Sequence, residues 1–189
     1  MIALALILAV APADVPQLQA VSVPTEEFCV DCCNLYCAAC PTLSVSHHLA
    51  PQGRAQYDAA RLEDGHPTTA WVVSEGVSEW FQFKFEPGEG QNLHQSIGVN
   101  ELLLLNGYAK SPGHWRDHAR AKDLDLVVDG VVRAHITLLD DSKPQSVALP
   151  KIPLHPDLTL RFIVRSVYAG AKFNELALSE ARIDGYGHH

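Results

Sequence analysis

Polar and apolar residues alternate in several short runs along the chain, which is the pattern of half-buried β-strands. Within residues 80–85, for example, Phe81, Phe83 and Phe85 fall on one face. Residues 97–105 form a denser apolar run, typical of a strand buried on both faces. Further runs lie at residues 124–128, 131–136, 145–149, 158–167 and 177–183. We therefore predict six to eight strands and an all-β fold, a jelly-roll β-sandwich.

The clearest turn lies between two of these runs, at Asp129-Gly130. Asp-Gly between alternating strands is a strong hairpin signal, because both central residues of the tight turn need positive φ angles. We predict that Val128 and Val131 pair across this turn.

Length, composition and charge limit the possible functions. The chain has 189 residues, and 47% of them are hydrophobic, which is enough to form a sizeable core. The formal net charge is −8, and no run of basic residues occurs. Because binding to phosphate backbones requires clustered cations, the sequence argues against a nucleic-acid partner and against electrostatic attachment to a membrane surface.

The amino terminus has the pattern of an export signal. Residues 2–10 are continuously apolar but too few to span a bilayer, and small residues follow at Ala11-Pro12-Ala13 and at Ala20. We predict a signal peptide over residues 1–20 and a secreted, periplasmic or cell-envelope location. No basic residue follows Met1, and the alternative is a buried amino-terminal strand. Nothing later in the sequence is apolar enough to predict a transmembrane segment.

All five cysteines occur within twelve residues. They are Cys29, Cys32, Cys33, Cys37 and Cys40. The spacing allows a small disulfide cluster, a metal site or a redox site, and predicted export favours disulfides. The odd count leaves one thiol, which could form a disulfide-linked dimer. The proline-containing segment 21–55 is therefore predicted to be a Cys-rich extension preceding a compact domain at residues 56–187.

An acidic turn precedes the first strand of the predicted compact domain. Asp64-Gly65 favours a tight turn, and Thr69 follows at the entry to the strand. The Asp64 carboxylate, the Thr69 hydroxyl and nearby carbonyls are hard oxygen donors that suit calcium. The alternative is an ordinary loop with a solvated aspartate.

Several motifs resemble those of one known family. The quoted segments are Asp64-Gly65-x-x-x-Thr69-x-Trp71, Glu79-Trp80-Phe81, Asn106-Gly107-Tyr108-Ala109-Lys110-Ser111, Ala119-Arg120-Ala121-Lys122, Val167-Tyr168-Ala169-Gly170-Ala171-Lys172 and Leu178-Ser179-Glu180. In this order they resemble the discoidin-like (coagulation-factor C-domain) β-sandwiches, most closely the bacterial NADase-type glycan-binding domain. Ala181 stands where that family usually has isoleucine.

The resemblance implies a binding module that often carries a structural calcium ion. By comparison with the family, the calcium ligands would be Asp64, Thr69 and Glu180, with the carbonyl of His66 as an addition. His66 replaces the small polar residue that is more usual at this position. Family members present loops at one end of the sandwich to a glycan, a lipid head group or a protein.

One long polar segment is the candidate ligand-binding loop. Its candidate residues are Tyr108, Lys110, His114, Trp115 and Arg120. Sugars stack on aromatic side chains and bind flanking charged groups, so these residue types fit a glycan. The alternative is that Tyr108 and Trp115 pack over the open end of the sandwich.

No sequence motif supports catalysis. The chain has ten histidines, but it contains no H-E-x-x-H, no G-x-S-x-G and no glycine-rich phosphate loop. We therefore predict a non-catalytic, exported module that recognises a glycan or another cell-surface ligand. Two alternatives remain: a structural or protein-interaction domain of the envelope, and a metal- or thiol-active protein that works through Cys29–Cys40.

Overall fold

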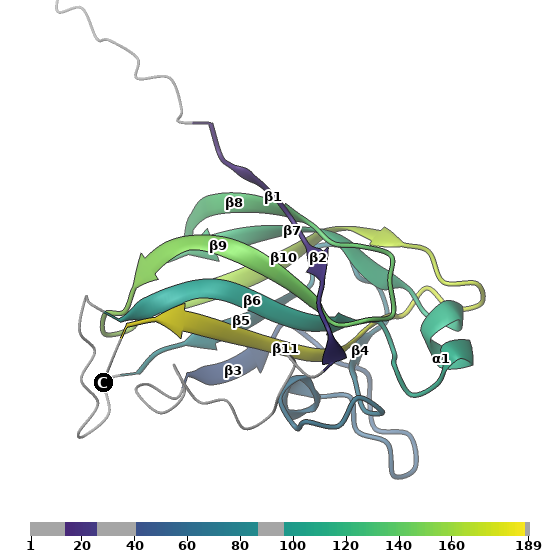
Figure 1. Ribbon diagram of the computed structural model, residues 1–189. Helices are drawn as coiled ribbons and strands as arrows, with labels where there is room; N and C mark the ends of the chain where they lie inside the picture. The colour runs from purple at the N-terminus through teal and green to yellow at the C-terminus, as the bar shows by residue number, and fades with distance from the viewer. Residues whose placement is uncertain (1–13, 26–40, 87–96, 188–189) are drawn as a thin grey trace, which may run out of the picture.

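Two β-sheets stack face to face and enclose one hydrophobic core (Figure 1). The computed structural model describes residues 14–25, 41–86 and 97–187. The first sheet has the order β1-β8-β7-β10-β5-β3, and the second has the order β2-β9-β6-β11-β4. This arrangement confirms the predicted β-sandwich.

The strands of the first sheet are β1 (Gln17–Gln19), β3 (Thr42–Val45), β5 (Trp80–Lys84), β7 (Arg120–Val128), β8 (Val131–Thr137) and β10 (Thr159–Tyr168). Those of the second are β2 (Val21–Ser22), β4 (Trp71–Val73), β6 (Gly98–Asn106), β9 (Gln145–Pro153) and β11 (Leu176–Tyr186). The short 3-10 helix η2 (Ala59–Leu62) and the α-helix α1 (Pro112–Asp117) lie in connecting segments. No helix within the described ranges is long and apolar enough to cross a membrane.

Inward-facing aromatic residues of β5 contribute to the core, as the alternation in residues 80–85 predicts. Phe81, Phe83 and Phe85 are all buried. The rings of Phe81 and Phe162 stack with centroids 5.0 Å apart, which joins β5 to β10. Trp71 is fully buried, and its indole N–H donates to the carbonyl of His47 at 2.7 Å, so burial leaves no unsatisfied donor.

The predicted hairpin is confirmed. Asp129 and Gly130 have φ angles of 48° and 80°, and Val128 pairs with Val131. The Asp129 side chain also accepts from the backbone N–H of Thr159 at 2.9 Å, which joins the turn to the start of β10.

The predicted start of the compact domain at residue 56 is wrong. β1 pairs with β8, β2 pairs with β9, and β3 pairs with β5, so residues 17–22 and 42–45 belong to the two sheets. These strands are at most four residues long. Leu18, Leu43 and Val45 alternate with polar residues and pack against the core, but each run is too short to identify a strand from the sequence. The compact domain therefore begins by Gln17.

This correction affects the predicted signal peptide. Ala20 is buried, and its N–H donates to the carbonyl of Thr137, so a signal ending at residue 20 would remove β1. A cleavage after Ala13 would keep every described strand. Residues 1–13 and the five cysteines lie outside the described residues, so the signal peptide and the disulfides stay predictions.

Candidate functional site

The acidic turn after η2 gathers oxygen atoms from three residues. Asp64 Oδ1 accepts from the backbone N–H of His66 at 2.9 Å, and Gly65 supports the turn with a φ angle of 70°. Thr69 Oγ1 lies 2.9 Å and 2.8 Å from the two Asp64 oxygens and 2.9 Å from the carbonyl oxygen of His66. Thr69 Oγ1 is therefore within hydrogen-bond distance of both the Asp64 carboxylate and the His66 carbonyl.

Glu180 approaches this turn from β11. Its side chain is fully buried, and neither carboxylate oxygen makes a hydrogen bond with any described residue. Burial raises the pKa of Glu180 from its ordinary value of 4.5 to about 7; Arg182 lowers it, and the nearby charge of Asp64 raises it. A buried carboxylate without hydrogen bonds is costly when ionised, and a bound cation would relieve that cost.

Two arginines flank the carboxylates. Arg61 Nη1 lies 3.0 Å from Asp64 Oδ2, and Arg182 Nη2 lies 3.6 Å from Glu180 Oε2. The second distance is too long for a hydrogen bond, so Arg182 acts on Glu180 mainly through its charge.

The donor chemistry fits a hard cation. Carboxylate, hydroxyl and carbonyl oxygens are the groups that calcium prefers, and Glu180 brings two buried oxygens that make no hydrogen bond with any described residue. Within the described ranges, no group of three or more His, Cys, Asp or Glu side chains is arranged to hold a metal. A cation here would therefore depend on Asp64 and Glu180 together with the neutral oxygens of Thr69 and His66.

A short helix occupies the segment that was expected to be a loop. Ser111 caps α1, because its hydroxyl accepts from the backbone N–H of His114 at 3.2 Å, and Pro112 begins the first turn. The segment after β10 holds the other end of α1. The N–H groups of Lys172 and Phe173 donate to the Asp117 carbonyl, and Lys172 Nζ lies 2.8 Å from Asp117 Oδ2.

Trp115 on α1 is fixed in place from three directions. Its indole N–H donates to the carbonyl of Asn106 at 2.8 Å, and its ring packs against Gly107, where an added Cβ would come within 2.6 Å of the indole. The Arg120 guanidinium lies 4.5 Å from the ring centre. Arg120 is itself held by the Asp140 carboxylate at 2.9 Å and 3.0 Å. The indole is therefore preorganised but remains half-exposed.

Open space lies beside this indole. A pocket of about 460 Å³ is lined by Ala109, Ser111, Pro112, Trp115, Arg116 and Ser142. It combines an aromatic surface, two hydroxyls and an exposed guanidinium from Arg116, and its volume lies within the range of small-ligand sites.

The predicted ligand residues divide into two groups. Trp115 lines the pocket, and Lys110 is exposed on the segment that leads into α1. Tyr108 and Arg120 are only 7% and 6% exposed, and both pack beneath α1, as the alternative interpretation of Tyr108 anticipated. His114 is half-buried and packs edge-on against Tyr108, with ring centroids 5.3 Å apart.

Arg116 and Ser142 line the pocket but were not among the predicted residues. Arg116 adjoins Trp115 in sequence, yet without a predicted helix its direction could not be inferred. Ser142 comes from the connection between β8 and β9, and no sequence pattern links that connection to α1.

One buried hydroxyl connects the acidic turn to the pocket. Ser179 Oγ donates to the carbonyl of Pro67 and accepts from the N–H of Ala109, both at 3.0 Å. Pro67 lies in the acidic turn, Ala109 lines the pocket, and Glu180 follows Ser179 in β11. The two candidate sites therefore share a rigid support at one end of the sandwich.

Comparison with known proteins gives a family match and a fold match. The sequence model of the family described as "NAD glycohydrolase translocation F5/8 type C domain" matches residues 35–184. A solved structure of the CBM32-1 and CBM32-2 domains of ZmpB from Clostridium perfringens superposes with a TM-score of 0.59 at 8% identity. That match covers 92% of this chain but only 42% of the other, so the chain spans less than half of that protein's solved length.

A second solved structure is a fragment of a putative chitobiase from Bacteroides thetaiotaomicron. It has 18% identity and a TM-score of 0.44, and the match covers 70% of this chain and 78% of that one. No curated protein matches the chain. At 8% identity, the match to the ZmpB domains describes the fold alone.

Proposed function

Because the chain belongs to the family of NAD glycohydrolase translocation F5/8 type C domains, we propose that it is an exported binding module that recognises a glycan beside α1. The family and the CBM32-like fold support a binding role rather than catalysis. The single observation that carries the proposal is the half-exposed Trp115 indole, which is held rigidly at the wall of a 460 Å³ pocket.

The chemistry of the pocket suits a sugar. A sugar ring presents a C–H face that packs on an indole, and its hydroxyls need hydrogen-bond partners at the rim. Ser111, Ser142 and Arg116 supply such partners. Because Asn106, Gly107 and Arg120 already fix the indole, a ligand would order few side chains on binding, which favours affinity.

A glycan array followed by titration tests this proposal. We expect Trp115→Ala to weaken the best array ligand at least tenfold, because aromatic platforms dominate such sites. Trp80→Ala is the matched control: Trp80 is also half-exposed, and Arg161 lies 4.2 Å from its ring centre, but it stands in β5 away from the pocket. A blank array, or equal losses in the two variants, would contradict glycan recognition at α1 and favour a structural or protein-interaction role.

We further propose that Asp64, Thr69, Glu180 and the carbonyl of His66 bind a structural calcium ion. The buried carboxylate of Glu180, which makes no hydrogen bond with any described residue, supports this assignment. An ion bound only by the folded protein stabilises it by about 2.7 kcal/mol at a hundredfold excess over Kd, so chelation should lower Tm. Glu180→Gln should abolish this response, whereas the exposed control Glu86→Gln should retain it. A Tm that is the same with calcium and with chelator would reject the site.

A further inference from the structure

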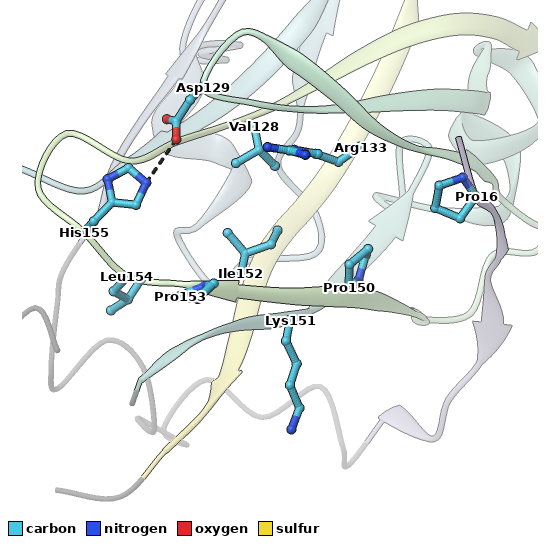
Figure 2. A pocket seen from close by; sticks show the side chains of 10 residues that line it. All are labelled: Pro16, Val128, Asp129, Arg133, Pro150, Lys151, Ile152, Pro153, Leu154 and His155. Carbon is cyan, nitrogen blue, oxygen red and sulfur yellow. Dashed lines mark ion pairs between the residues drawn. The ribbon is translucent and has the colours of Figure 1, made fainter. Parts of the chain in front are cut away.

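A second pocket lies at the other end of the sandwich from α1. β7 starts at Arg120, three residues after α1 ends, and runs to Val128, eight residues or roughly 26 Å further along. Val128 lines a pocket of about 640 Å³, together with Asp129 and residues 150–155 of β9 and the segment after it. Figure 2 shows the side chains that line this pocket. None of them lines the pocket beside Trp115, so the two pockets are separate.

The pocket forms where the amino-terminal strands stop covering the open side of the sandwich. β1 pairs only with residues 135–137 of β8, and β2 pairs only with Gln145 and Ser146 of β9. Within the described ranges, no strand continues this pairing along the first half of β8 or the second half of β9. The gap between these two strand edges is the pocket, and Pro16 marks its boundary with β1.

Irregular strand pairing directs Arg133 to this gap. The register of β7 and β8 shifts between Leu126 and Val127, so that Val127 pairs with Val132 and Leu126 pairs with Ala134. Arg133 is the extra residue and has no partner in β7. A bulge of this kind changes the direction of a side chain and is frequent beside functional sites. Figure 2 shows the Arg133 side chain extending toward Val128 across the pocket.

The charge of Arg133 is available to a ligand. Within residues 14–25, 41–86 and 97–187, Arg133 makes no ion pair or hydrogen bond. The other charged groups of the pocket already have partners. Asp129 Oδ2 lies 3.0 Å from His155 Nε2, while Lys151 points away from the pocket and places its Nζ 5.1 Å from the ring centre of Tyr186.

The rest of the lining is apolar. Val128, Ile152 and Leu154 are buried, and Pro16, Pro150 and Pro153 add ring surfaces without N–H donors. An apolar pocket of this size with one free guanidinium at its wall is complementary to a molecule with an apolar body and one anionic group. Among anions, carboxylate matches the planar fork of an arginine.

We propose that this pocket binds an aliphatic carboxylate, with the carboxylate paired to Arg133 and the alkyl chain packed on Val128 and Ile152. The net charge of −8 would disfavour a general anion site, so recognition depends on the local guanidinium and on the apolar lining together. This site is independent of the proposed glycan site, because the two pockets share no residue.

Titration with octanoate, followed by NMR and calorimetry, tests the proposal. We expect saturable binding with one ligand per chain and shifted signals at Val128 and Ile152. Affinity should rise by up to about fourfold for each methylene from butyrate to octanoate, as expected for burial of the chain. The neutral octanamide should bind at least roughly tenfold more weakly than octanoate, because it lacks the charge-assisted hydrogen bonds to Arg133.

Two arginine variants distinguish binding at this site from non-specific binding of octanoate. Arg133→Gln should weaken octanoate at least about tenfold while leaving Tm unchanged, since Arg133 is exposed and unpaired. Arg165→Gln is the matched control, an exposed arginine of the same sheet that pairs with Asp125 at 3.3 Å, and it should bind as wild type. The proposal is overturned if octanoate does not bind, if octanamide binds equally well, if Arg133→Gln has no effect, or if the shifts map to Trp115.

Discussion

Glu180 is a buried carboxyl group, so ionising it in the folded protein is unfavourable. Its pKa of about 7 in the folded protein exceeds its ordinary value of 4.5 because the side chain is buried. A carboxyl with a raised pKa favours folding while it is protonated. That stabilisation is complete below about pH 4.5 and is lost as the pH rises through about 7, at a cost on the order of 3 kcal/mol.

We therefore predict that, in chelator, the free energy of unfolding falls as the pH rises from about 5 to about 8. Urea titrations at several pH values measure this slope. Glu180→Gln should flatten it, because glutamine does not ionise, and Glu86→Gln should leave it unchanged. Identical slopes for wild type and Glu180→Gln would show that the buried carboxyl does not control the pH dependence.

Gly107 determines how closely Trp115 can pack on the end of β6. Its φ angle is 95°, and a Cβ would lie 2.6 Å from the indole. We predict that Gly107→Ala lowers stability by more than the roughly 1 kcal/mol expected for an alanine at positive φ, and also weakens glycan binding. Gly130→Ala is the control, since Gly130 also has positive φ, 80°, but its Cβ would meet no atom within 4 Å. Equal losses of stability in the two variants would contradict the packing argument.

At the residue level, the sequence was a better guide to which side chains meet in the acidic turn than to which side chains are exposed around α1. Asp64 and Thr69 belong to one motif, and Thr69 Oγ1 lies 2.9 Å from Asp64 Oδ1. Glu180 was implied by the family resemblance, and the nearby charge of Asp64 raises its pKa. Tyr108 and Arg120 have the right chemistry for a ligand, but they are buried beneath α1. Residue type alone does not tell which side of a short helix a neighbouring side chain will occupy.

At the level of elements, long strands were predictable and short ones were not. β5, β10 and the β7–β8 hairpin have alternating residues or a specific turn pair. In contrast, α1 has six residues, fewer than two full turns, so it has too little periodicity to detect. β1 and β2 are short edge strands whose place depends on pairing partners more than a hundred residues away.

The amino-terminal strands provide a prediction at this scale. A chain that begins at Asp14 should melt like the full-length protein, whereas one that begins at Val21 should lose roughly 3 kcal/mol of stability. The second truncation removes β1, buried Ala20 and the backbone hydrogen bonds from this segment to β8, each of them worth about 1 kcal/mol. Thermal and urea unfolding of the two chains measure the difference. Equal stability would show that β1 is dispensable and would be compatible with a signal peptide that ends at residue 20.

On the scale of the whole molecule, the sandwich separates two pockets with different chemistry. The pocket at α1 has an aromatic wall with hydroxyls, and the pocket at the hairpin end is apolar with a free arginine. Ser179 joins the α1 end to the acidic turn, so a cation held by Glu180 would also steady the backbone at Ala109. The sequence marked the segment around α1 as a candidate ligand-binding loop, whereas the second pocket lies between the edges of β8 and β9, which no local sequence pattern brings together.

The indole N–H signals of the three tryptophans offer the most direct test of glycan recognition at α1. Trp71 is buried in the core, Trp80 lies in β5, and Trp115 lines the pocket, so each reports on a different place in the molecule. When the best array glycan is titrated into the labelled protein, we predict that the Trp115 signal shifts and saturates while the Trp71 and Trp80 signals stay fixed. Saturable binding that leaves the Trp115 signal unmoved would contradict the account.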